Sequence, residues 1–433
     1  MANRADTDLL DPLLGSNHKG YPRTQAPRRR SGVGSAGWNV LAGDLPLPLA
    51  VLKREALEHN VAWMQDRVDA WGVSFAPHGK TTMSPQLFRR QLDAGAWGIT
   101  FATVTQLAVG VAAGARRTVI ANQVVSDEDL GGIQRLLRAH DGLRIVFLVD
   151  SLAQLALIDG WASRHDGSLP FEVMLELGVM GARTGVRTHE QAVELARATR
   201  VSQAVRLVGI ECYEGQGATG DDAGDRAYTD TLMDRVDAIA REAVAHGWFE
   251  CDEVLVSAGG SAVYDLVSAR LVPAIGKPVR GLLRSGCYVT HDHGTYRRYQ
   301  ASIDARLGCA AGDSLRAALE VWTVVQSRPE PGLALVSMGK RDVSFDLALP
   351  VPIARAARGA LVASAVPASW HVTALNDQHG YLRWEASDEA SAPVVGERVG
   401  FGISHPCTTF DKWRWMPVVE QDYRVVDAVT LHF

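Results

Sequence analysis

Short apolar segments alternate with amphipathic helical segments from about residue 50 to residue 290, and this alternation limits the possible folds more than any other feature. The apolar segments are continuously hydrophobic and partly β-branched, as in Ile145–Val149, which is typical of parallel strands buried on both faces. Eight strands are expected at Val73–Pro77, Trp97–Phe101, Thr118–Ala121, Arg144–Asp150, Phe171–Leu177, Leu207–Cys212, Glu253–Ser257 and Gly281–Leu283. Helices are expected between them, for example at Lys53–Ala70, Asp127–Ala139, His189–Ala198 and Tyr228–Ala245.

Eight strand–helix units over this length match a (β/α)8 barrel, and an open doubly wound sheet is the alternative. After residue 300 the pattern changes to strands separated by turns, which predicts a mainly β domain over residues 301–433. The strands of that domain are expected at Ala318–Ser327, Leu333–Met338, Gly380–Glu385, Arg398–Gly402 and Arg424–Phe433. We therefore predict an α/β chain with a barrel over residues 37–300, of which residues 37–50 could pair with the β domain.

The first 36 residues are polar and rich in Arg, Gly and Pro, without the apolar stretch of a signal peptide. We expect a flexible extension, with a short basic docking arm as the alternative. No apolar run reaches the roughly 18 residues of a membrane span. The net charge of −5 does not indicate binding to nucleic acid or to an acidic membrane surface. Five widely spaced cysteines make a disulfide framework improbable, which favours a cytoplasmic location.

One lysine stands at the end of the first expected strand, within Pro77-His78-Gly79-Lys80. Side chains at the carboxyl ends of barrel strands point into a common mouth. Desolvation there would favour the neutral, nucleophilic amine of Lys80, which could form an imine with a cofactor aldehyde. A solvated loop lysine is the alternative interpretation.

Two glycine-containing loops follow the seventh and eighth strands, where barrels of this type usually bind phosphate. Gly259, Gly260 and Gly286 could bring backbone N–H groups close to a phosphate, with Ser261 capping the next helix. Arg183 and Tyr213 follow the fifth and sixth strands. Arg183 could hold a carboxylate or a phenolic oxygen; a surface ion pair and a packed aromatic are the alternatives for these two residues.

His405 and Cys407 stand two residues apart on an expected extended segment, so both side chains can face the same way. An imidazole and a thiolate suit zinc, and two protein ligands leave positions open for water and substrate. A buried cysteine beside a packed histidine is the alternative. Other histidines are candidates for a further ligand or a general acid: His78, His291, His293, His371 and His379, the last of which we expect near the site.

These motifs, in this order, resemble the fold-type III pyridoxal phosphate enzymes, the alanine-racemase-like group. The likeness is closest to the branch of D-serine dehydratases, D-threo-3-hydroxyaspartate dehydratases and D-threonine aldolases, and it runs from about residue 45 to the C-terminus. The resemblance implies that Lys80 forms the Schiff base, that Arg183 belongs to an R-x-G element, and that Tyr213 lies by the cofactor ring. It also implies phosphate-binding loops at Gly259-Gly260-Ser261 and Gly286-Cys287-Tyr288, a His379-Gly380 turn, and a metal pair at His405 and Cys407.

Two positions depart from the pattern of this family. Many members continue the lysine motif with a His and a second Lys, whereas Thr82 and Met83 follow here. Many members have His after the Y-x-G element, and Gln216 stands there in this chain. Both changes could alter substrate contacts or an acid–base partner.

The resemblance suggests that aldolases of this branch favour His-x-Asp, whereas dehydratases favour His-x-Cys, so Cys407 indicates dehydration. We therefore predict a lyase that uses pyridoxal phosphate and zinc, or another divalent metal. It would convert D-serine or a related D-3-hydroxy amino acid to a 2-oxo acid and ammonia, and the resemblance implies a homodimer. The alternatives are a D-threonine aldolase, a racemase, and a pyridoxal phosphate carrier, which would lack a domain such as residues 310–433.

Overall fold

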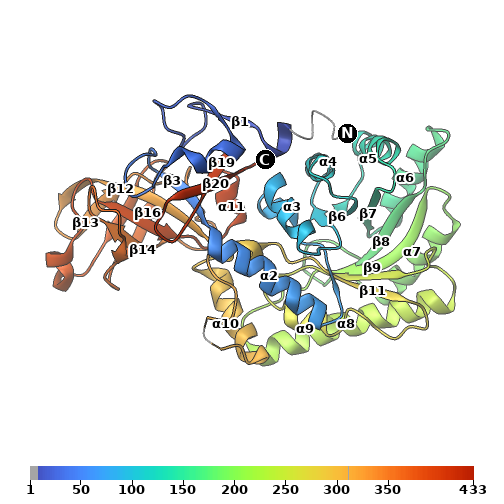
Figure 1. Ribbon diagram of the computed structural model, residues 1–433. Helices are drawn as coiled ribbons and strands as arrows, with labels where there is room; N and C mark the ends of the chain where they lie inside the picture. Colours follow the sequence, from blue (N-terminus) through green and yellow to red (C-terminus); the bar gives the residue numbers. More distant parts are fainter. Residues whose placement is uncertain (1–7, 311) are drawn as a thin grey trace.

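Eight parallel strands form a barrel in the computed structural model, which describes residues 8–310 and 312–433 (Figure 1). Neighbouring strands follow the order β4-β11-β10-β9-β8-β7-β6-β5, and a bridge between His78 and Thr100 joins the two ends. The predicted (β/α)8 barrel is therefore confirmed over the open sheet. The strands are β4 (Ser74–Phe75), β5 (Ile99–Phe101), β6 (Arg117–Gln123), β7 (Arg144–Val149), β8 (Phe171–Leu177), β9 (Val205–Cys212), β10 (Val254–Ala258) and β11 (Val279–Leu283).

Apolar side chains from alternate positions of the strands fill the inside of the barrel. This inner cluster consists of Ala76, Val119, Val146, Leu148, Met174, Val208, Leu255 and Leu282. Because these side chains close the centre of the barrel, polar groups can gather only near its ends.

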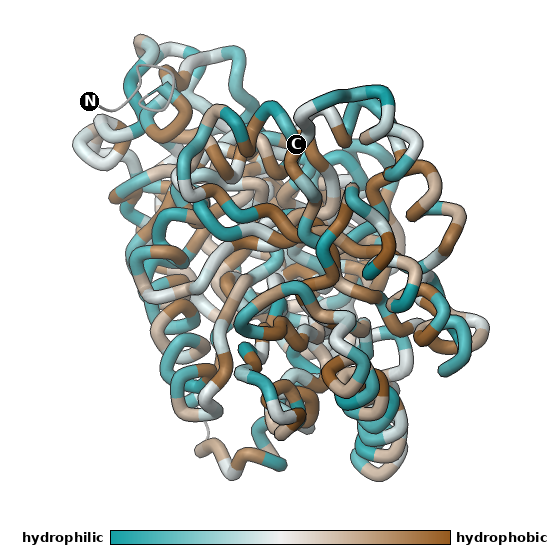
Figure 2. The backbone as a smooth tube through the Cα atoms, turned by 90° about the vertical axis from the view of Figure 1, so that its right-hand side faces the viewer, coloured by the Kyte–Doolittle hydropathy of each residue, from teal (hydrophilic) through white to brown (hydrophobic). Residues whose placement is uncertain are grey.

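Helices surround the barrel and alternate between hydrophilic and hydrophobic positions along their length (Figure 2). Most begin at a Ser or Thr whose side chain accepts a hydrogen bond from the backbone three residues on, as at Ser126 and Thr188. The helices are α2 (Arg54–Ala70), α3 (Pro85–Asp93), α4 (Val104–Ala112), α5 (Asp127–Ala139), α6 (Leu152–Ser163), α7 (His189–Val201), α8 (Asp222–Ala245), α9 (Tyr264–Ser268) and α10 (Thr295–Leu307). No helix in the described part of the chain is both long and apolar enough to cross a bilayer.

The second domain is built from antiparallel strands and one early strand, and it lies beside the barrel (Figure 1). β3 (Leu49–Lys53) pairs with β12 antiparallel and with β19 parallel, so the segment before the first barrel helix joins this domain. The other strands are β12 (Leu319–Glu330), β13 (Leu333–Val336), β14 (Val351–Ala356), β15 (Ser364–Ala365), β16 (His371–Leu375), β17 (Gly380–Arg383), β18 (Arg398–Gly402), β19 (Trp415–Val419) and β20 (Val425–Thr430).

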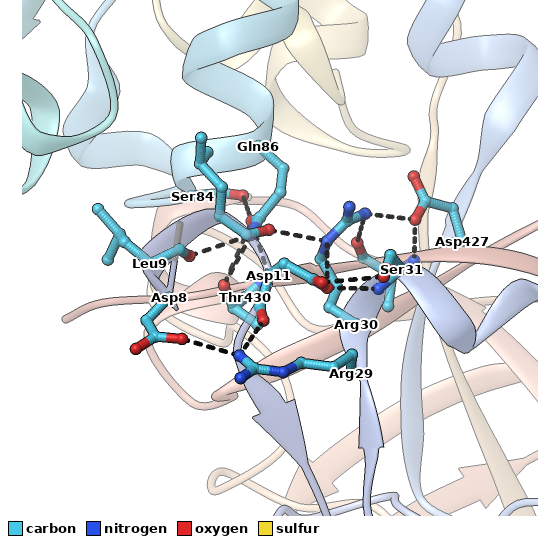
Figure 3. A network of polar contacts seen from close by, with 12 residues as sticks. Asp8, Leu9, Asp11, Arg29, Arg30, Ser31, Ser84, Gln86, Asp427 and Thr430 are labelled. Atoms are coloured by element: carbon cyan, nitrogen blue, oxygen red, sulfur yellow. Dashed lines mark hydrogen bonds and ion pairs between the residues drawn. The ribbon is translucent and has the colours of Figure 1, made fainter. Parts of the chain in front are cut away.

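Residues 8–36 differ from the flexible extension that their composition suggested. They form a small hairpin, β1 (Leu13–Leu14) with β2 (Arg28–Arg29), and bury Leu14, Tyr21 and Val33. Arg30 pairs with Asp427 of β20 at 2.6 Å (Figure 3). The Gln86 amide of α3 also donates a hydrogen bond to Leu10 O at 3.0 Å. Arg30 therefore serves as an internal contact, whereas Arg29 stays exposed. Residues 1–7 lie outside the described part.

Candidate active site

A cavity of about 380 Å³ opens at the carboxyl ends of the barrel strands, against the β domain. Both domains contribute to its wall, since His405 and Cys407 face loops of the barrel across it. Nine residues expected at the site from the sequence line this cavity: Lys80, Arg183, Tyr213, Gly259, Ser261, Gly286, Cys287, His405 and Cys407. The fold thus brings together side chains that are more than three hundred residues apart in the chain.

Lys80 lies in a single 3-10 turn, Gly79–Thr81, directly after the first barrel strand. Close packing fixes this turn, because a Cβ at Gly79 would come within 3 Å of Phe88, Ile99 and Phe101. His78 lies beside it, and no hydrogen-bond partner for its buried Nδ1 is found in the described part of the chain. Burial, and then the charges of Lys80 and Arg284, hold the pKa of His78 well below its usual value, so this ring is neutral.

A buried ion pair between Arg284 and Glu211 also lines the cavity, and the sequence analysis did not identify either residue. Burial raises the pKa of Glu211 to about 8, although Arg284 acts in the opposite direction. Glu176 lies nearby and accepts a hydrogen bond from Thr184 at 2.6 Å. A signal was present: Glu176 and Glu211 are carboxylates that follow apolar residues near the carboxyl ends of their strands, and Glu211 is two residues before Tyr213, hence on the same face.

Arg183 and Tyr213 contact each other at the cavity, with the guanidinium carbon 4.7 Å from the ring centroid. Burial raises the pKa of Tyr213 to about 12, so its hydroxyl stays protonated. Gln216 accepts a hydrogen bond from the backbone N–H of Arg183 at 3.2 Å and does not line the cavity. Its contact in this chain is therefore with the arginine loop.

The two glycine-containing loops present different sets of backbone amides. The N–H groups of Gly259 and Gly260 donate to the buried Glu214 carboxylate at 3.2 and 2.6 Å, so an internal anion already uses them. Within residues 8–310 and 312–433, no protein acceptor is bonded to the N–H groups of Ser261, Gly286 and Cys287. The prediction that Ser261 caps the next helix is wrong, because α9 begins at Tyr264 and Val263 is its N-cap. At Gly286 a Cβ would lie 2.6 Å from Thr81 Oγ1 and 2.7 Å from His78 O, so only glycine lets this loop approach the lysine turn.

The proposed metal pair lies where the chain leaves β18 and enters a short helix, α11 (Cys407–Phe410). The prediction of an extended segment is therefore wrong, because Pro406 is already helical and Cys407 begins the turn. Both side chains nevertheless line the same cavity. Sγ of Cys407 also lies 3.5 Å from Thr81 Oγ1 and 3.7 Å from Sγ of Cys287.

The charges of this pair are strongly coupled. A hydrogen bond from Cys287, and then contact with His405, hold the pKa of the Cys407 thiol well below its usual value. Burial alone would lower the pKa of His405, but Cys407 and Asp346 outweigh it and raise that pKa to about 9. The pair therefore forms a thiolate and an imidazolium in the protein alone.

Several expected site residues lie away from the cavity. Gly260 is buried on Glu214, and Tyr288 packs inward, where its hydroxyl accepts a hydrogen bond from Gln91 at 3.0 Å. His379 is exposed in the turn between β16 and β17, and His371 is also exposed. His291 is buried and His293 is half-buried in the loop before α10.

The residues present fit both groups that the sequence suggests. Lys80, two arginines and the free amides of Ser261, Gly286 and Cys287 suit an aldehyde cofactor with a phosphate. His405 and Cys407 offer the nitrogen and sulfur ligands that zinc prefers, and Asp346 orients the imidazole. Across the described ranges, no three His, Cys, Asp or Glu side chains already surround one point in metal-ligating positions.

Comparisons with known proteins agree with this site. A model of the alanine racemase N-terminal domain matches residues 52–271, just over half of the chain, and one of a putative serine dehydratase domain matches residues 318–419. D-threonine aldolase of Arthrobacter sp. is 26% identical over 367 residues, covering 84% of this chain and 86% of the relative. D-threo-3-hydroxyaspartate dehydratase of Delftia sp. strain HT23 is 26% identical over 375 residues, covering 84% of this chain and 92% of that relative. A solved cysteine-to-alanine mutant of a D-threo-3-hydroxyaspartate dehydratase, in the metal-free form, aligns with a TM-score of 0.69 at 25% identity, covering 92% of this chain and all of that one.

Proposed function

Because the chain belongs to the alanine-racemase-like, fold-type III family of pyridoxal phosphate enzymes, we propose that it is a metal-assisted D-3-hydroxy-amino-acid dehydratase. Its first expected substrate is D-serine, which would give pyruvate and ammonia, and its expected metal is zinc. The observation that carries this proposal is the position of His405 and Cys407 on the wall of the cavity that also contains Lys80.

The relatives support the general reaction class. Two of them are named for reactions of D-3-hydroxy amino acids, one an aldolase and one a dehydratase. The metal-free structure of a cysteine-to-alanine mutant is consistent with a cysteine ligand in that dehydratase. Cys407 favours the dehydratase for this chain, because a thiolate suits zinc better than the hard cations preferred by carboxylates.

Each group of the cavity has a task in such a reaction. Bound pyridoxal phosphate would spread the negative charge left at Cα of the substrate. Lys80 would hold the cofactor aldehyde and, once released, accept the Cα proton on Nζ. The amides of Ser261, Gly286 and Cys287 would hold the phosphate. Arg183 would hold the substrate carboxylate or the phenolic oxygen of the cofactor.

The leaving group explains the need for a metal. Hydroxide leaves poorly, and a divalent ion on His405 and Cys407 would supply Lewis-acid stabilisation to the β-oxygen. The neutral His78 and the protonated Tyr213 add hydrogen-bonding groups without adding charge near Lys80. A single lysine serving one face of the substrate would favour one enantiomer.

We also propose a homodimer in which each barrel mouth faces the β domain of the other copy. His379 is exposed at the end of a hairpin of that domain, so in such a dimer it could approach the cavity of the partner. Light scattering of the purified protein would test this arrangement, and a monomeric mass would reject it.

The test of the main proposal is pyruvate release from D-serine by the purified protein, before and after chelation, with zinc added back. We expect pyruvate that disappears on chelation and returns with zinc, no product from L-serine, and none from Lys80→Ala. Glycine and acetaldehyde from D-threonine, without 2-oxobutyrate, would instead establish the aldolase. Racemisation that is insensitive to chelation would overturn both.

A further inference from the structure

Two cysteines from different domains meet at the proposed metal position. Cys287 follows β11 of the barrel, Cys407 begins α11 of the β domain, and their Sγ atoms are 3.7 Å apart. Both are free thiols on the wall of the same cavity, and Cys287 is only 6% exposed. The family resemblance accounted for the backbone of Cys287, as part of a phosphate loop, but gave no task to its thiol.

The distance between these sulfur atoms is suited to a shared metal. A tetrahedral zinc with Zn–S bonds of about 2.3 Å holds two thiolates about 3.8 Å apart. A disulfide would require the same atoms at about 2.05 Å, so it needs a rearrangement of one side chain. His405 stands two residues before Cys407 and lines the same cavity, so the two sulfur atoms and this imidazole lie on one wall.

We infer that Cys287 is a third ligand of the metal, which completes a Cys–Cys–His site on the wall of the cavity that also contains Lys80. Two thiolates and one imidazole form a known catalytic zinc arrangement, in which the fourth position takes water or substrate. The inference rests on the proposed metal-assisted function. As the metal binds, the Cys287 thiol proton and one proton of the His405 imidazolium would leave to solvent, while Cys407 would bind as the thiolate that it already is.

This ligand set also changes what the metal does for the fold. The two sulfur ligands would come from the loop after β11 and from α11, so the ion would connect the barrel to the β domain. Binding to the folded state alone raises the free energy of unfolding in proportion to the logarithm of metal concentration. The backbone N–H of Cys287 remains available for a phosphate, because the thiol and the amide are separate groups.

Cobalt titration of the protein with its cofactor bound, in reducing buffer, tests the inference without measuring turnover. The intensity of thiolate-to-cobalt charge-transfer absorption follows the number of sulfur ligands. We expect Cys287→Ser and Cys407→Ser each to keep about half of the wild-type band, and the double variant to keep none, since each thiolate contributes one metal–sulfur bond. Zinc affinity, from competition with a coloured chelator, should fall at least about 10-fold in Cys287→Ser.

Cys309→Ser is the matched control, because Cys309 is partly buried but lies outside the cavity. It should leave the band and the zinc affinity unchanged. A full band in Cys287→Ser together with its complete loss in Cys407→Ser would overturn the third ligand and leave the proposed function standing. If Cys287→Ser does not fold, the loss of the whole charge-transfer band in Cys407→Ser would by itself contradict Cys287 as a third ligand. Wild-type protein that binds neither cobalt nor zinc, or that has only three titratable thiols in denaturant, would overturn both.

Discussion

Nδ1 of His405 lies 2.5 Å from Oδ2 of Asp346, and the other oxygen of that carboxylate accepts a hydrogen bond from Thr408 at 2.8 Å. The carboxylate is thereby fixed while it orients the ring. A histidine that donates Nδ1–H to a carboxylate presents Nε2 to a metal with raised basicity. Asp346 is therefore an outer partner of the proposed metal site, recruited from a loop nearly sixty residues before the histidine.

Asp346→Asn should weaken zinc binding about 10- to 100-fold, as outer-partner substitutions commonly do. The amide keeps the shape of the side chain but removes its charge. Chelator competition measures the effect, and Asp377→Asn, at the exposed ion pair with Arg341, should bind zinc like the wild type. Unchanged affinity in Asp346→Asn would mean that His405 does not bind the ion through Nε2.

Lys80→Ala should abolish the visible absorbance of the bound cofactor, because no other lysine lines the cavity in the described part of the chain. Lys80→Arg is the sharper variant, since it keeps the positive charge but cannot form an imine. Both should lose turnover, whereas the exposed Lys340→Ala should keep absorbance and turnover. Visible absorbance retained in Lys80→Arg would remove this residue from the proposed role.

The barrel was predictable from local sequence because each strand and helix carries its own signal. Phe171–Leu177 and Asp127–Ala139 have the same bounds in the sequence prediction and in the structure. The N-terminal segment was not predictable in this way. The residues around Arg30 in the sequence suggest a polar, exposed segment. Its carboxylate partner Asp427 lies almost four hundred residues away in the chain, so the local sequence does not reveal the ion pair.

In the site, too, residues marked by a local motif were predictable, whereas contacts between distant parts of the chain were not. Lys80, Cys407 and the glycine loops were identified because motifs mark them. Glu211 was missed although its apolar strand and its spacing from Tyr213 mark it, whereas Arg284 becomes informative only when its partner Glu211 is known to lie opposite. The contact between Cys287 and Cys407 depends on how the two domains pack, which no pattern within either domain reveals.

Protonation of His291 should make stability fall in acid. Burial, and then His293, lower the pKa of His291 to about 3, whereas an unfolded histidine titrates near 6.5. The unfolded chain therefore binds the extra proton below pH 6.5, so this contribution is fully present above that pH and is lost progressively down to about pH 3. His291→Asn, chosen because φ is 48° there and asparagine tolerates that region, removes the effect.

The measurement for His291 is the free energy of unfolding in urea at pH 7.5 and at pH 5.5. Between these values the wild type should lose about 1.4 kcal/mol more than His291→Asn, the cost of one proton taken up by the unfolded chain alone. Equal losses in the two proteins would show that the ring is already protonated in the folded state.

Asp427 joins the N-terminal segment to the barrel and should contribute measurably to stability. One of its oxygens pairs with Arg30 at 2.6 Å (Figure 3) and the other pairs with Arg90 of α3 at 2.9 Å. All three side chains are about two-thirds buried or more. Asp427→Asn should lower the free energy of unfolding by about 1–2 kcal/mol, because two partly buried arginines lose their charged acceptor. Asp93→Asn breaks the exposed pair with Arg89 and should change the free energy of unfolding by less than about 0.5 kcal/mol. Equal effects of the two substitutions in urea unfolding would show that the Asp427 ion pairs do not stabilise the packing of residues 8–36.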